Sequence, residues 1–108
     1  MTSASLPFGR APEPPAERVA SLLALLDGRG WQSAKALARQ MDTDDRTIRA
    51  IAAASEGAVI SGQRGYCLTS QASVRDVQHA ASWLRHQAQQ MTKRAYQIER
   101  AMHQRGAA

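Results

Sequence analysis

The chain has 108 residues, a formal net charge of +5 and a single cysteine. This length suits one small domain with a tail or two, and the basic charge suits a polyanionic partner, although net charge by itself supports only non-specific attraction. The lone Cys67 excludes an intrachain disulfide framework and, since no Cys/His cluster accompanies it, a structural zinc site.

The beginning of the chain shows no targeting or membrane signal. It lacks a basic-then-apolar signal pattern, and no run approaches the roughly 18 apolar residues of a membrane span. We therefore expect a soluble cytoplasmic protein, associated with the nucleoid if it binds DNA. Residues 1–15 hold all four prolines among Ser, Ala and Gly, and we expect a disordered tail there. The alternative is that this segment is a proline-rich ligand for another protein.

Residues 16–27 have the apolar periodicity of a helix. The apolar positions on its expected inner face are Val19, Leu22, Leu23 and Leu26. Gly28 is suited to end this helix because glycine adopts the left-handed conformation that follows many helices. We expect Trp31, a few residues later, to pack over the core, and stacking on nucleic acid is the alternative.

Residues 37–51, LARQMDTDDRTIRAI, indicate two short helices joined by a tight turn. Ser33 is placed to cap the first helix, which we expect to run to about Met41. Asp44 is placed to cap the second, because such side chains accept the free backbone N–H groups of a first helical turn. A turn of this length between two helices is the helix-turn-helix layout.

This run resembles the helix-turn-helix core of bacterial and phage winged-helix regulators, with the pattern LA-x-x-x-x-[VT]-[SD]-x-RT-[IV]-R. The resemblance implies that the second helix, residues 45–55, enters the major groove of double-stranded DNA. Arg46, Thr47 and Arg49 would then face the bases. Lys35, in the first turn of the preceding helix, would contact a phosphate.

Two positions depart from the family pattern. Asp42 stands where the family usually has Gly, and Thr43 where it usually has Val or Ile. Aspartate tolerates the left-handed conformation better than most residues, so we expect the turn to form. Thr43 offers less apolar burial, so we expect the turn to be slightly loosened.

Residues 58–69, AVISGQRGYCLT, predict a β-hairpin with a turn bracketed by two glycines. The ending GYCLT resembles the G-Y-x-L-T that closes the wing in many winged-helix proteins. Alternation along the strand places Tyr66 and Leu68 on one face, towards the core, and Cys67 on the other. The resemblance puts two residues of the turn on the flanking DNA groove: Gln63 and Arg64.

Residues 73–105 contain neither Gly nor Pro and predict one long helix, with Ser73 and Asp76 as a variant capping box. Apolar residues recur at intervals of three and four over four heptads, which indicates a coiled-coil seam of roughly 43 Å. The seam consists of Val74, Val77, Ala81, Leu84, Ala88, Met91, Ala95, Ile98 and Met102.

We expect this seam to form a homodimer, and the alternative is that the helix folds back along its own domain. The seam alone leaves parallel and antiparallel order open, although Arg94 and Glu99 could form an ion pair in a parallel dimer. His79 and His86 lie about 10 Å apart along the helix, too far to share a metal ion.

The predicted fold is mainly α with a small β-hairpin: a winged helix-turn-helix domain over residues 16–70 and a coiled-coil-like helix over residues 71–108. The predicted function is sequence-specific binding of double-stranded DNA by a dimeric transcriptional regulator, in particular a repressor. No cofactor, metal ion, small-molecule ligand or membrane partner is expected.

Other functions remain open. The winged helix could serve as the scaffold of a protein-interaction or assembly module, or of a phage replication or excision accessory factor. RNA binding has less support because paired exposed aromatic residues are lacking. Enzymatic activity is not expected, since Asp42, Asp44 and Asp45 fit a turn and a cap, and no histidine or glutamate is close enough to complete an acid–base site.

Overall fold

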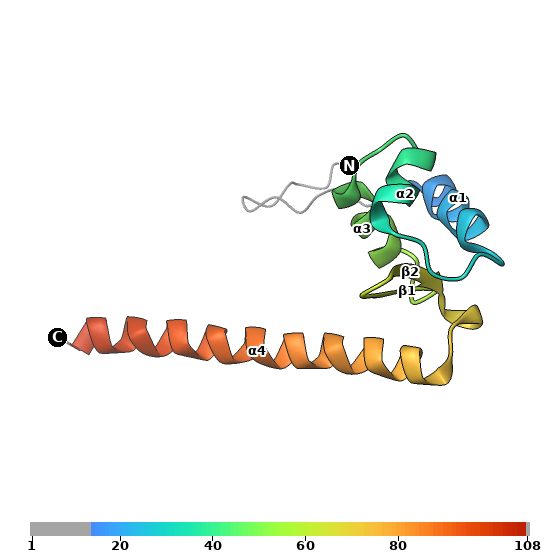
Figure 1. Ribbon diagram of the computed structural model, residues 1–108. Helices are drawn as coiled ribbons and strands as arrows, with labels where there is room; N and C mark the ends of the chain where they lie inside the picture. Colours follow the sequence, from blue (N-terminus) through green and yellow to red (C-terminus); the bar gives the residue numbers. More distant parts are fainter. Residues whose placement is uncertain (1–13, 108) are drawn as a thin grey trace. The chain divides into compact units, whose positions relative to one another are not determined.

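The computed structural model describes residues 14–107, which divide into two units, the first ending at Ala72 and the second beginning at Ser73. The first unit holds three short helices followed by a β-hairpin, and the second is one long helix (Figure 1). This order confirms the mainly α fold with a small hairpin and is consistent with a winged helix. Most of the expected N-terminal tail lies outside the described residues.

The helices and strands begin and end close to the predicted positions. α1 ends at Leu26, with Asp27 as its C-cap residue, and α3 ends two residues earlier than expected. The elements are α1 (Ala16–Leu26), α2 (Ala34–Gln40), α3 (Asp45–Ala53), β1 (Val59–Gly62), β2 (Gly65–Leu68), the 3-10 helix η1 (Thr69–Gln71) and α4 (Val74–Ala107).

The core of the first unit is built from one apolar face of each element. The buried side chains that form it are Leu22, Leu26, Leu37, Ala38, Ile48, Ile51, Val59 and Tyr66. Val19 and Leu23 pack against this cluster from α1, so the four residues of the predicted inner face all point inward. Met41 packs against the same cluster from the end of α2.

The turn between α2 and α3 is closed by a pair of backbone hydrogen bonds. The N–H of Thr43 donates to the carbonyl of Ala38 at 2.8 Å, and the N–H of Asp42 donates to the carbonyl of Arg39 at 3.3 Å. This is the Schellman arrangement, and it needs a left-handed residue at its centre. Asp42 supplies it, with φ of 53°.

The turn that we expected to be slightly loosened at Thr43 is closed by both hydrogen bonds. The Thr43 hydrogen bond depends on the backbone and not on an apolar side chain, so the loss of a valine or isoleucine there leaves the turn closed. The predicted caps are confirmed: Ser33 Oγ accepts from the N–H of Ala36 at 3.1 Å, and an Asp44 carboxylate oxygen accepts from the N–H of Thr47 at 2.8 Å.

The hairpin pairs β1 with β2 in antiparallel register, with Gly62 opposite Gly65. A third segment joins the sheet, because Gln32 and Tyr66 exchange backbone hydrogen bonds of 2.9 and 2.8 Å. Thr69 Oγ1 closes the hairpin by donating to the Gly57 carbonyl at 2.5 Å. The threonine that ends GYCLT thus ties the end of β2 to the segment that leads into β1.

The two faces of β2 both carry buried side chains. Tyr66 belongs to the core cluster and Leu68 packs against it, as predicted. Cys67 points to the opposite face, as expected from strand alternation, yet it is only 2% exposed. Burial at this position is a feature that the alternation pattern alone did not predict.

The second unit is one helix of 34 residues, capped at its start by Ser73 Oγ, which accepts from the N–H of Asp76 at 3.1 Å. At 1.5 Å per residue such a helix is about 51 Å long. Among the residues that the structure describes, no helix is both long enough and apolar enough to cross a membrane.

Candidate nucleic-acid interface

α3 presents a narrow exposed face that carries two arginines. Ile48 and Ile51 are fully buried and fix the opposite face of the helix against the core. Arg46 and Arg49 are exposed, together with two alanines of the following turn, Ala50 and Ala53. Small side chains beside the arginines leave the backbone of α3 open to close approach by another molecule.

Thr47 lies at the edge of this face and not at its centre. Its side chain is half-buried, in contrast to the two arginines. Its N–H is engaged by the Asp44 cap. Thr47 therefore has a smaller accessible surface for a ligand than its neighbours, and its position differs from the fully outward one we expected.

The start of α3 is electrostatically mixed. Hydrogen bonding from Thr47 holds the pKa of Asp44 below its ordinary value of 3.8, and the positive charge of Arg46 acts in the same direction. Asp42, Asp44 and Asp45 are all exposed beside the arginine face. A polyanion that approaches α3 would meet these carboxylates at the N-terminal end of the helix and the arginines along its length.

Positive charge is distributed unequally between the two units. Residues 14–72 contain seven Arg and Lys residues and six Asp and Glu residues, a net charge of +1. Residues 73–107 contain six against two, a net charge of +4. The basic character of the chain, which suggested a polyanionic partner, therefore lies mainly on α4.

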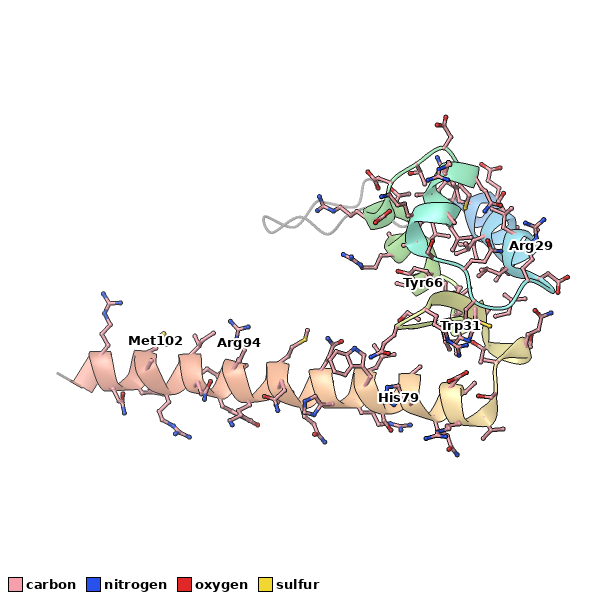
Figure 2. The ribbon with its side chains drawn as sticks, in the orientation of Figure 1. Arg29, Trp31, Tyr66, His79, Arg94 and Met102 are labelled. Carbon is pink, nitrogen blue, oxygen red and sulfur yellow. The ribbon has the colours of Figure 1, made fainter. Side chains whose placement is uncertain are left out.

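The turn of the hairpin is held against Trp31. The guanidinium carbon of Arg64 lies 5.0 Å from the centroid of the Trp31 ring, within the range of a cation–π interaction. A Cβ atom on Gly62 would come within 3.1 Å of Trp31 Cη2, so the ring also lies directly against the end of β1. Figure 2 labels Trp31 beside the hairpin strands, with Tyr66 on the same sheet.

Gly65 makes this arrangement possible. Its φ is 116°, and a Cβ atom there would come within 2.8 Å of Ser33 Cα and closer still to the Gln32 carbonyl group. Neither Gln63 nor Arg64 has a positive φ, so Gly65 alone supplies the unusual backbone conformation of the turn. The glycine allows β2 to approach the Gln32 segment closely enough to pair with it.

Three of the predicted contact residues lie around one edge of the unit. A shallow hollow of about 290 Å³ is lined by Ser33 and Ala34 from the start of α2 and by residues 61–66 of the hairpin. Lys35 follows directly in the chain, and it is exposed, as are Gln63 and Arg64. The exposed arginines of α3 form a separate face on the next helix.

Our expectation that Trp31 packs over the core is wrong. Trp31 is half-buried, and it is absent from the residues that pack against the core cluster. It contacts the hairpin turn instead, because the Gln32–Tyr66 bridge brings the preceding residue alongside β1 and β2. The Gly at position 62 is the sequence signal that could have indicated this contact, since a glycine at a strand end often leaves room for a neighbouring group.

α4 carries the predicted seam. Val77 and Ala81 are half-buried, and the later members, Ala88 and Ala95 included, are exposed. The large ones are conspicuously so: Leu84 is 63% exposed, while Met91, Ile98 and Met102 are each 67% exposed. Figure 2 shows Met102 projecting from the second half of the helix. A long row of exposed large apolar side chains suggests an oligomerisation surface.

No group of histidine, cysteine, aspartate or glutamate side chains within residues 14–107 is arranged to hold a metal ion. Comparison with known proteins gives no assignment: no family model matches the chain, and the searches of curated proteins and of solved structures find no significant match. The functional argument therefore depends on the geometry of α3, the hairpin and α4.

Proposed function

We propose that the protein is a winged-helix regulator that binds double-stranded DNA as a homodimer, in particular a transcriptional repressor. The observation that carries the proposal is the exposed arginine pair of α3, Arg46 and Arg49, on a helix that follows a closed helix-turn-helix turn. An arginine on such a helix can hold a guanine through two parallel hydrogen bonds in the major groove.

The hairpin supports the same function as the wing. Arg64 is exposed, yet its guanidinium is oriented by Trp31 and is not a fully flexible side chain. A cation with restricted motion loses less conformational entropy when it enters a groove or contacts the backbone. Gln63 precedes it in the turn, and Lys35 adds a phosphate contact from the start of α2.

The charge distribution predicts the character of the binding. With a net charge of only +1, the first unit attracts DNA weakly by bulk electrostatics. Specific contacts by the two α3 arginines would then carry a large share of the affinity. The contact face holds few polar side chains, so discrimination by one copy is modest, and two copies joined through α4 would bind two half-sites with greater selectivity.

The experiment is a mobility-shift assay on random-sequence and genomic DNA at two salt concentrations, for the wild type and for Arg46→Ala/Arg49→Ala. We expect affinity that falls as salt rises and is largely lost in the double variant. The matched control is Arg29→Ala/Arg100→Ala, which removes two charges from exposed positions outside α3 and outside the seam of α4 and should retain most of the affinity. Equal losses in both double variants would mean that binding is non-specific and would contradict the role of α3.

A second candidate function is a protein-interaction or assembly module, for example a replication or excision accessory factor, with the first unit as scaffold. The exposed apolar row of α4 favours it. The same assay separates the two: absence of DNA binding by a folded wild-type chain would favour the interaction module, with α4 as its functional surface.

A further inference from the structure

The seam of α4 has two rows that differ in side-chain size. In the middle of the seam one row is small and the other large: Ala81, Ala88 and Ala95 against Leu84, Met91 and Ile98. We propose that α4 pairs with the α4 of a second copy in antiparallel order, in a register that places each of these alanines against a large side chain of the other copy. The inference deepens the homodimer of the proposed function, rests on it, and does not depend on DNA binding.

Parallel pairing would make poor use of these two rows. In a parallel pair each residue meets its own counterpart, so alanine layers would alternate with layers of two large side chains. The large layers hold the helices apart, and the alanine layers between them are then left with unfilled space. Because interiors are close-packed, each such void forfeits contacts on both sides.

Antiparallel pairing makes the layers similar in size. The spacing of three and four reads in the opposite order when one helix is reversed, so a residue of the small row meets one of the large row. With the centre of the pair between Gln89 and Gln90, the layers combine residues whose numbers add to the same total. They are Val77 with Met102, Ala81 with Ile98, Leu84 with Ala95, and Ala88 with Met91.

This register also covers the seam fully. If one helix slides along the other by one heptad in one direction, Met102 lies opposite no seam residue. If it slides in the other direction, Ala81 lies against Arg105. The centred register avoids both outcomes. In it the only charged residue that reaches the seam, Arg105, lies beside Val74 at the end of the pair, where a long side chain extends readily into water.

Charge favours the same order. Residues 74–90 have a net charge of +1 and residues 91–107 a net charge of +3. Parallel pairing sets the two strongly basic halves side by side, whereas antiparallel pairing sets each beside the weakly charged half. The ion pair that Arg94 and Glu99 could form in a parallel dimer is the one feature that favours parallel order, and exposed pairs of this kind contribute little.

The order of the helices decides where the two DNA-binding units are attached. In the antiparallel register, Val74 of one copy lies at the level of Arg105 of the other. The two Val74 residues are then roughly 46 Å apart along the pair, so the first units attach at opposite ends. A parallel pair would attach both at one end.

Spin labels on one outward row of α4 can test the order directly. The row consists of His79, His86, Lys93 and Arg100, which are seven residues apart and all exposed. Each is replaced singly by cysteine in the full chain, and Cys67→Ala removes the native thiol. After spin labelling, the distance between the two labels of a dimer is measured by pulsed electron paramagnetic resonance. Sedimentation and circular dichroism of each labelled variant confirm that it remains a folded dimer.

The four positions give different patterns for the two orders. In the antiparallel register, the two labels of a dimer are offset along the axis by about 31 Å when both are at position 79 or both at position 100. They are offset by about 10 Å when both are at position 86 or both at position 93. We therefore expect two long and two short distances. Four equal distances would establish parallel pairing and overturn the inference. A chain that sediments as a monomer would overturn it too, because no pair would form.

A cross-linking measurement keeps the test decisive if Cys67→Ala unfolds the first unit. In the wild-type background, where Cys67 is buried, a chain with Leu84→Cys is mixed with a differently tagged chain with Ala95→Cys. Antiparallel pairing gives disulfides between the two tagged chains, and parallel pairing gives them only within each species. DNA affinity enters neither measurement, so a failure here is distinct from a failure of the proposed DNA binding.

Discussion

The guanidinium carbon of Arg64 lies 5.0 Å from the centre of the Trp31 ring, which joins the hairpin turn to the segment between α1 and α2. Thirty-three positions separate the two residues in the sequence, and the backbone bridge between Gln32 and Tyr66 brings them together. The tip of the hairpin is therefore supported by a residue of another segment. This support has a consequence for function, since Arg64 is one of the proposed DNA contacts.

Removal of the Trp31 ring should weaken DNA binding although the ring itself touches no DNA in the proposal. A cation–π interaction at an exposed site contributes about 0.5–1 kcal/mol. If that orientation is lost, we expect Trp31→Ala to lower the affinity roughly two- to five-fold, and the phenyl ring of Trp31→Phe to restore part of it. Fluorescence anisotropy on a site selected with the wild type provides the measurement.

The matched control for Trp31 is Trp83→Ala, because Trp83 is also a partly exposed tryptophan, 55% accessible as a residue, but lies on α4. We expect its affinity for DNA to stay within two-fold of the wild type. Equal losses at the two positions would indicate a general effect of removing a tryptophan and would contradict the specific support of Arg64.

Gly65→Ala should be far more destabilising than the same change at Gly57. Both glycines have a positive φ, 116° at Gly65 and 87° at Gly57, so both substitutions strain the backbone. Only at Gly65 does the added Cβ meet the Gln32 backbone, whereas nothing lies within 4 Å at Gly57. We expect a loss of about 1–2 kcal/mol in the free energy of unfolding at Gly57 and at least about 2 kcal/mol more at Gly65, measured by urea unfolding.

The Gly65 variant has a structural signature as well. If the added methyl group separates β2 from the Gln32 segment, the amide protons of Gln32 and Tyr66 lose their protection from hydrogen exchange, because these two residues bond to each other. Retained protection of both amides, with stability close to that of the Gly57 variant, would show that the close approach is unnecessary.

The local features of the fold could be predicted because they depend on residues close together in the sequence. Ser33, Asp44 and Ser73 each cap a helix through a backbone N–H three residues later. The left-handed conformation of Asp42 likewise follows from the position of the turn between two apolar patterns. Such interactions need no knowledge of the tertiary structure.

The features that could not be predicted depend on contacts between distant segments. Trp31 has the character of a core residue, and only the pairing of Gln32 with Tyr66 directs it to the hairpin turn. The half-burial of Thr47 follows from the rotation of α3 about its axis, which packing of Ile48 and Ile51 determines. The requirement for glycine at position 65 was also hidden, because the Gln32 carbonyl group that a side chain would meet lies 33 positions away in the sequence.

Ser55→Ala should remove a hydrogen-bonded link between α3 and β1. The Ser55 hydroxyl donates to the Ala52 carbonyl at 2.7 Å and accepts from the N–H of Val59 at 3.1 Å, and the residue is buried. In the alanine variant the Val59 N–H loses this acceptor inside the protein. An unsatisfied buried donor costs about 1–3 kcal/mol, so we expect a loss of that size in the free energy of unfolding.

Ser70→Ala serves as the control for Ser55, because Ser70 is exposed. Its effect should remain within about 0.5 kcal/mol of zero, as for most surface substitutions. Urea midpoints of the two variants, measured side by side, check the difference. A Ser55 variant as stable as the Ser70 variant would mean that water or a neighbouring group replaces the hydroxyl.

The cap of α3 should make stability depend on pH through Asp44. Hydrogen bonding from Thr47 lowers the pKa of the folded-state carboxyl below its ordinary value of 3.8, so the folded protein holds this proton less tightly than the unfolded chain. The contribution is therefore fully present well above pH 3.8 and is lost as the pH falls through the lower folded-state pKa.

Asp44→Asn keeps an oxygen that accepts from the Thr47 N–H but cannot titrate, so its stability should fall less steeply than that of the wild type between pH 5 and pH 2.5. The two proteins differ only at position 44, so the difference between their urea-midpoint profiles isolates Asp44. Parallel profiles would show that the cap does not depend on the charge of Asp44.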